Sequence, residues 1–257
     1  MKLHRIRALL RKHYYLSTAG ISRSFDMLYW PAFGLIVFGL TALFVEEQGA
    51  DIRIFLIGGL ILWVVFERLQ QDINIYLLED FWSGNVANEY ATPITSTERF
   101  IALFITALIR SIISLGLMAL LGYTLYAFNF FNIHPAGILY ALPLFLTAWA
   151  LAAVVAGLVV QHGIRIQMIA WAVAALVQPI AAAFYPVSIL PNWLQPIAYM
   201  TPLAHTFEGY REALAGNFML GQLITATILS VLFILIGYAY FVYSENKGKE
   251  NSTIAEN

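Results

Sequence analysis

The chain has 257 residues, of which 60% are hydrophobic and 11% charged, with a formal net charge of −1 and a mean hydropathy of +0.74. About a quarter of the residues of a soluble globular protein are charged, so this composition excludes that class and indicates an integral membrane protein. The lack of cysteine excludes disulfides, thiolate metal ligands and cysteine nucleophiles.

The first 26 residues are expected to form a basic amphipathic helix on the cytoplasmic side. Its basic residues are Lys2, Arg5, Arg7, Arg11, Lys12 and Arg23. Apolar residues recur among them at helical spacing, at Leu3, Ile6, Leu10 and Tyr14. This pattern predicts a helix lying on an anionic membrane surface. A disordered basic tail that only sets the topology is the alternative.

Six apolar stretches predict six membrane-spanning helices, which form one domain over residues 27–243. The first span is expected at 27–45, and because no small-residue cleavage site follows it, we expect an uncleaved signal anchor. The remaining spans are expected at 54–78, 100–128, 137–160, 168–184 and 221–243. The polar tail over 244–257 is expected to be disordered.

The distribution of basic residues predicts the orientation of these spans. An even number of spans places both termini on one side of the membrane. The Lys and Arg residues outside the spans would fall on that side, except for Arg53 and Arg211. The positive-inside rule therefore predicts cytoplasmic termini in the cell membrane.

The polar segment over 79–99 is expected to be a cytoplasmic loop that contains a short helix. Three residues at i, i+4 and i+8 predict one face of that helix: Trp82, Val86 and Tyr90. Thr95 and Glu98 have the spacing of a capping box, which would start the third span.

Charged residues interrupt the second and third spans at Glu67, Arg68, Asp72 and Arg110. At 1.5 Å per residue, Glu67 and Arg110 reach similar depths, about 16 and 18 Å from the cytoplasmic ends of their helices. Because an isolated charge is costly there, we expect Arg110 to pair with Glu67 or Asp72. The alternative is a local Arg68–Asp72 pair, with Arg110 facing a water-filled cavity. Either arrangement indicates helix packing rather than a catalytic centre.

The segment over 178–216 is apolar but rich in proline, with Pro179, Pro186, Pro191, Pro196 and Pro202. Each proline removes a backbone donor and obstructs the preceding turn, so the segment cannot be one spanning helix. Irregular backbone is tolerated at membrane depth only where it is buried in protein or lines a cavity. We therefore expect two re-entrant half-helices between the fifth and sixth spans.

Pro191 would start the first half-helix, whereas Thr201 would cap the second and Gly216 would end it. An apolar stripe is expected at Leu203, Phe207, Tyr210 and Leu214, with Glu208, Arg211 and Glu212 projecting outward. These half-helices would form an outer gate for an amphipathic substrate. The residues expected in this gate are Tyr185, Pro186, Pro191, Trp193, Pro202, His205, Glu208 and Arg211. A rigid outer plug that only stabilises the protein is the alternative.

Several kinds of catalytic site are missing from the sequence. No G-x-x-x-x-G-K-[ST] string could hold nucleotide phosphates, no G-x-S-x-G elbow occurs, and the five histidines are scattered singly. We therefore expect no enzymatic activity, metal or cofactor in this chain, and no nucleic-acid partner. Any energy that it uses must therefore come from elsewhere.

Two stretches resemble the type-2 ABC exporter permeases, the membrane subunits of polysaccharide, lipo-oligosaccharide and drug exporters. LLEDFWSGNVANEYATPITSTERF is similar to the cytoplasmic loop of that family. FYPVSILPNWLQPIAYMTPLAHTFEGYREALAG resembles the family signature through Tyr185-Pro186, Leu190-Pro191, Pro202-Leu203 and Arg211.

This resemblance implies a half-transporter that forms a homodimer and binds two separate P-loop ATPases, which would hold ATP and magnesium. Residues 80–91 would be the coupling helix that enters a groove of the ATPase. Its expected contacts are Asp80, Phe81, Trp82, Asn85 and Glu89, with Arg165 in a second, smaller contact. The substrate exported would be a glycan, glycolipid, lipid or drug.

Two other functions stay open at this point. The first is an intramembrane lipid-modifying enzyme that uses His205 with Ser188 or Glu208. The second is a secondary carrier or channel, which only the charges in the second and third spans support.

Overall fold

The computed structural model describes residues 1–18, 21–47, 53–129 and 135–250, and within these ranges it contains helices and loops but no strand. In chain order the helices are α1 (Leu3–Thr18), α2 (Ile21–Glu47), α3 (Arg53–Trp82), α4 (Val86–Tyr90), α5 (Ser96–Tyr126), α6 (Pro135–Leu139), α7 (Ala141–His162), η2 (Gly163–Ile166), α8 (Gln167–Ala181), η3 (Val187–Ile189), α9 (Gln195–Tyr199), α10 (Pro202–Leu214) and α11 (Leu220–Glu250).

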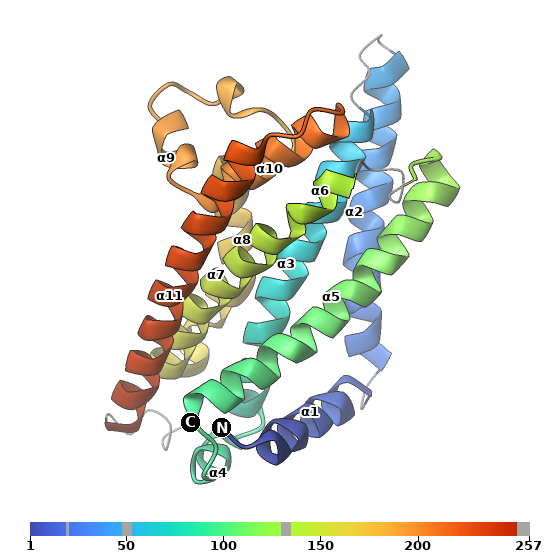
Figure 1. Cartoon of the computed structure of the whole chain (residues 1–257). Helices are drawn as coiled ribbons and strands as arrows, with labels where there is room; N and C mark the ends of the chain where they lie inside the picture. Colours follow the sequence, from blue (N-terminus) through green and yellow to red (C-terminus); the bar gives the residue numbers. More distant parts are fainter. Residues whose placement is uncertain (19–20, 48–52, 130–134, 251–257) are drawn as a thin grey trace.

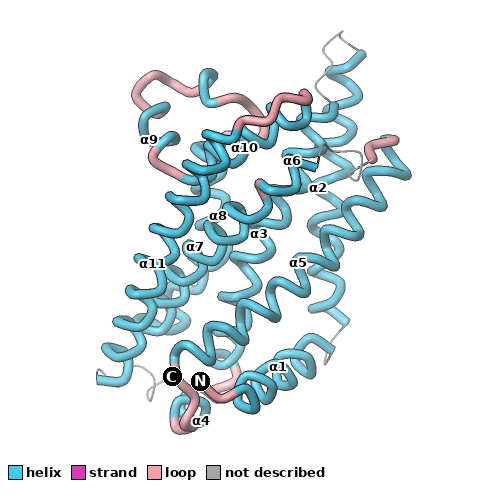
Figure 2. Tube along the Cα trace, in the orientation of Figure 1, coloured by secondary structure: helices cyan, strands magenta, loops and turns pink. Residues whose placement is uncertain are grey.

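The long helices form one elongated bundle (Figure 1). The short helices α1 and α4 lie at one end of it, together with the N-terminus and the last turns of α11. The segment that contains η3, α9 and α10 lies at the other end, and it is where the loops are longest (Figure 2). The two ends of the bundle therefore correspond to the two polar or broken segments of the sequence.

Four stretches of the described residues are long and apolar enough to cross a membrane: Leu28–Glu47, Ser96–Tyr126, Gly137–Ala181 and Leu220–Lys249. The third contains α7 and α8, which are separated by η2; this short helix begins at Gly163, a residue with a positive φ of 63°. The helix α3 has 30 residues and so the length to cross, but charged residues interrupt its apolar sequence. The chain is therefore an all-helical, multi-pass membrane protein.

Small residues bring α7 and α11 into close contact. A Cβ atom on Gly237 would lie 2.6 Å from the backbone oxygen of Ala150, so only glycine fits at this position. Nearby, the hydroxyl groups of Thr147 and Ser230 lie 2.9 Å apart and join the two helices. Three small residues spaced four apart on α7 are also fully buried: Ala148, Ala152 and Ala156.

Helix α1 buries a different face from the one that the sequence predicted. Ile6, Leu9 and His13 are buried, and the apolar pair packs with Ala102 of α5. Leu3 and Tyr14, which were expected on the apolar stripe, are 77% and 64% exposed. The prediction failed because several apolar registers fit one short helix, and contacts with α5 select among them.

The boundaries of the first and last long helices also differ from expectation. Helix α2 begins at Ile21, so the expected division between residues 26 and 27 falls inside it. The expected disorder over 244–257 is wrong for 244–250, where α11 continues and Ser244 and Glu245 are fully buried. The rest of this tail, 251–257, lies outside the described residues. By contrast, the capping box of Thr95 and Glu98 is confirmed at the start of α5.

Candidate functional site

Residues 83–95, here called the α4 loop, connect α3 with α5. The family resemblance implied one helix over 80–91, but α3 continues to Trp82 and the chain then turns at Gly84, whose φ is +67°. A positive φ is a conformation that glycine adopts without steric cost, and it ends α3 here. The separate helix α4 has only five residues.

Three of the five expected ATPase contacts in this region are turned into the protein. Asp80, Phe81 and Glu89 are 6%, 4% and 8% exposed, so the prediction that they form an outer contact surface is at odds with their burial. Trp82 is 44% exposed and Asn85 is half-buried. Because Val86 is buried while Trp82 is exposed, these two residues do not share the face that their spacing predicted.

Trp82, the last residue of α3, contacts the corner between α7 and α8, immediately before the α4 loop. Its indole nitrogen donates to Gln167 Oε1 at 2.9 Å, and its ring stacks on Trp171 with a centroid distance of 6.1 Å. Arg165, which was expected to make the second ATPase contact, is exposed on η2 at the same corner. The structure therefore places the two expected contact regions next to one another.

Lys12 of α1 binds the two buried carboxylates of this region, Asp80 and Glu89. Burial and the nearby Glu89 carboxylate raise the pKa of Asp80, although Lys12 opposes them. Burial also disfavours ionisation of Glu89, but Lys12 and Arg99 together hold its pKa below the usual range. One ammonium group therefore connects α1 with both ends of the turn between α3 and α4.

Arg99 forms the centre of a second buried group at the start of α5. Its Nε donates to Glu89 Oε1 at 3.1 Å and its Nη1 to Glu245 Oε1 at 2.6 Å, which ties α4 to the end of α11. The guanidinium lies 3.9 Å from the centroid of the Tyr90 ring, and the Tyr90 hydroxyl donates to Glu245 at 2.8 Å. Sequence reasoning missed this group because its members are up to 155 residues apart.

The charges inside the bundle divide into two sets. Arg110 Nε donates to Asp72 Oδ2 at 2.8 Å, so the expected pairing of Arg110 is confirmed with Asp72 and not with Glu67. Arg68 and Glu67 both bond to the amide of Gln71, which accepts from Arg68 and donates to Glu67 Oε1 at 3.0 Å. The expected alternative of a local Arg68–Asp72 pair with an unpaired Arg110 is therefore wrong.

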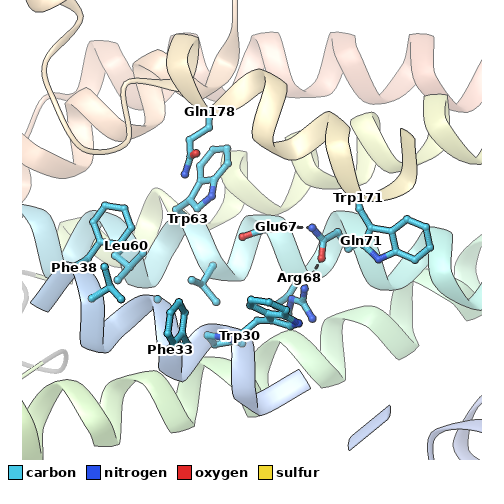
Figure 3. A pocket seen from close by; sticks show the side chains of 14 residues that line it. Trp30, Phe33, Phe38, Leu60, Trp63, Glu67, Arg68, Gln71, Trp171 and Gln178 are labelled. Atoms are coloured by element: carbon cyan, nitrogen blue, oxygen red, sulfur yellow. Dashed lines mark hydrogen bonds between the residues drawn. The ribbon is translucent and has the colours of Figure 1, made fainter. Parts of the chain in front are cut away.

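A cavity of about 520 Å³ lies between α2, α3 and α8 (Figure 3). Its lining combines aromatic rings with the Glu67–Gln71–Arg68 group and the amide of Gln178. The aromatic residues are Trp30, Phe33, Phe38, Trp63 and Trp171. Such a cavity accommodates an organic molecule that has both polar and apolar parts. Across all of the described ranges, the cavity included, no group of three His, Cys, Asp or Glu side chains is placed to hold a metal ion.

Most of the chain matches a known protein family. The family model described as ABC-2 type transporter matches residues 9–215. The chain belongs to the ABC-2 type transporter family. The match runs from α1 through α10, and it includes the α4 loop and the cavity, whereas α11 lies outside it. No curated protein matches the chain significantly.

In this ABC-2 transporter the proline-rich segment is broken into short pieces, as its sequence predicted. Thr201 caps α10 by accepting from the backbone N–H of Ala204, and Pro202 occupies the first turn. The first half-helix does not begin at Pro191, because α9 begins at Gln195 after the turn that Pro191 opens. The apolar stripe of α10 is confirmed, with Leu203, Phe207 and Tyr210 buried and Leu214 half-buried.

The charged residues of α10 hold the segment together and do not simply project outward. Arg211 Nη2 donates to the backbone oxygens of Ala182 and Tyr185 at 2.6 and 2.9 Å, which closes the carboxyl end of α8. Glu208 Oε1 accepts from the Val187 backbone N–H at 3.2 Å and from the Tyr199 hydroxyl at 3.3 Å. Of the other expected gate residues, Pro186, Pro191 and Trp193 are exposed, Tyr185 is half-buried and Pro202 is buried.

The ring nitrogens of His205 contact groups other than those that a catalytic pair would need. Nδ1 lies 2.6 Å from Gln222 Oε1, and Nε2 lies 2.9 Å from the backbone oxygen of Tyr199. His205 therefore joins α10 to α9 and α11. This geometry gives no support to the enzyme that the sequence left open, because both nitrogens are engaged away from Ser188 and Glu208.

Proposed function

We propose that this ABC-2 transporter is the permease subunit of an ATP-binding cassette exporter, which moves an amphipathic substrate outward across the cell membrane. Two separate cytoplasmic P-loop ATPases would supply the energy and would bind ATP and magnesium. The chain itself would therefore need no cofactor. The permease would act as a dimer of two identical protomers.

The α4 loop is the observation that carries this proposal. Its exposed residues Ala87 and Asn88, together with Trp82, offer a surface at one end of the bundle. Its buried residues connect through Lys12 and Arg99 to α1, α3, α5 and α11. A partner that pushed on the exposed side would thus displace several long helices at once, because buried ion pairs resist separation.

We further propose six spans, formed by α2, α3, α5, α7, α8 and α11, with cytoplasmic termini. The charges of α3 would be tolerated in the membrane because Arg68 and Asp72 are buried in the bundle and bonded to neighbouring side chains. The segment from η3 to α10 would re-enter the outer leaflet as the gate, with Arg211 and Glu208 holding its two halves together.

Site-specific cross-linking tests the partner, because the chain has no cysteine of its own. We would introduce Asn88→Cys in the α4 loop and, as a matched exposed control at the opposite end, Ser188→Cys. With a co-expressed P-loop ATPase and a short bifunctional reagent, we expect a cross-link from position 88 and none from position 188. The proposal fails if position 88 gives no cross-link and if transport in vesicles proceeds without ATP.

A further inference from the structure

We propose that the cavity between α2, α3 and α8 binds the cationic end of an amphipathic ammonium compound, through the Glu67 carboxylate and the surrounding aromatic rings. This inference rests on the proposed function, since it names the substrate class of the same permease. It goes beyond that function because neither the fold nor the family match distinguishes a cation from a glycan, a lipid or a neutral drug.

Glu67 differs from Asp72, a second carboxylate of α3, in its ion-pair partner. Asp72 has its own cation, Arg110, at 2.8 Å, whereas no basic side chain in the described residues forms an ion pair with Glu67. Its carboxylate accepts a hydrogen bond from the neutral amide of Gln71, at 3.0 Å. Because a charge inside a membrane is costly without a partner, a cation brought by a ligand would stabilise this carboxylate.

The neighbouring Arg68 attracts the Glu67 carboxylate electrostatically but forms no direct ion pair with it. It is 5% exposed and donates to Gln71 Oε1, which fixes the orientation of the amide so that its NH₂ group faces Glu67. In Figure 3 the Glu67 carboxylate points toward Trp63, whereas the Arg68 guanidinium lies beside Trp30. The negative charge is thus presented at one part of the cavity and the positive charge at another.

The aromatic lining suits an ammonium group and its hydrocarbon tail. The faces of tryptophan rings attract cations within about 6 Å, and the attraction is strongest in a site without water. Trp63 is one of the rings that line the cavity, and it lies next to Glu67. Phe33, Phe38 and Leu60 form an apolar surface along the other side of the cavity, where a tail would lie.

Three probes with the same tail separate the possible substrate classes: octyltrimethylammonium, octyl glucoside and octyl sulfate, each used below its micellar concentration. The full-length chain would be purified into lipid nanodiscs without ATPase or ATP. Binding would be followed by intrinsic tryptophan fluorescence, because Trp30, Trp63 and Trp171 line the cavity. We expect the ammonium compound to bind about tenfold more tightly than either other probe.

Glu67→Gln keeps the shape of the side chain and removes its charge, so we expect it to abolish the preference for the ammonium compound. Glu47→Gln removes an exposed carboxylate at the end of α2, outside the cavity, and should leave the preference intact.

Equal or tighter binding of the glucoside would overturn the inference in favour of a hydroxyl-rich substrate, and tighter binding of the sulfate would overturn it as well. An ammonium preference that survives Glu67→Gln would also overturn it. These outcomes are independent of the proposed function, because the cross-link from Asn88→Cys to an ATPase and the ATP dependence of transport test that function without reference to Glu67.

Discussion

Replacing Arg99 by methionine should destabilise the protein strongly. Arg99 is 2% exposed, and its removal would leave Glu89 with Lys12 as its remaining cation and Glu245 with the Tyr90 hydroxyl alone. Removing one partner of a buried ion pair costs about 3 to 5 kcal/mol. For a chain of this size each kcal/mol lowers Tm by about 2 to 4 °C, so we expect a decrease of about 6 to 20 °C.

The assay is thermal unfolding in detergent, followed by intrinsic tryptophan fluorescence. Arg165→Met is the matched control, since Arg165 is exposed, and it should change Tm by less than 2 °C. The double variant Arg99→Met with Glu245→Gln should regain part of the loss, because it neutralises a fully buried carboxylate. A decrease below about 2 °C for Arg99→Met would refute the view that this ion-pair group holds the end of the bundle together.

Three further predictions concern other contacts. Gly237→Ala should lower stability by about 1 to 3 kcal/mol because its Cβ would meet the Ala150 backbone oxygen, whereas Gly221→Ala, with open space around it, should be neutral in the same thermal assay. Arg110→Leu should impair folding or transport by leaving Asp72 buried without its cation, and a fully active variant would contradict this pairing. Burial lowers the pKa of His13 to about 4, so protonation of His13 favours detachment of α1 from the bundle. The free energy that holds α1 in place should therefore fall by up to about 3 kcal/mol as pH decreases from about 6.5 to 4. Hydrogen exchange of the α1 amides, corrected for intrinsic rates, should reveal that change, and His13→Gln should remove the part of it that His13 contributes.

Features set by neighbouring residues were predictable from the sequence. The capping box of α5, the cap of α10 and the broken proline-rich segment each depend on residues a few positions apart. Their signals are local because a cap or a proline acts on its own turn.

Features set by distant partners were not predictable in the same way. The polar end of α11 has the composition of a disordered tail, and it is ordered because Glu245 meets Arg99 from a point 146 residues earlier. Asp80 and Glu89 lie in a segment that has the composition of a solvent-exposed loop. They are buried, and both bind Lys12, which lies 68 and 77 residues earlier in the chain. No local pattern specifies such pairs, because an acidic residue has the same sequence signal whether it faces water or a buried cation.

The placement of Glu245 affects how this protein can be shortened or tagged. Ending the chain after Tyr243 would delete what reads as a dispensable polar end, yet it would remove the acceptor of both Arg99 and Tyr90. A shortened chain for crystallisation or expression should therefore keep Glu245 and the helical turn around it. A fusion partner attached directly after this turn would lie in the same region where an ATPase is proposed to bind.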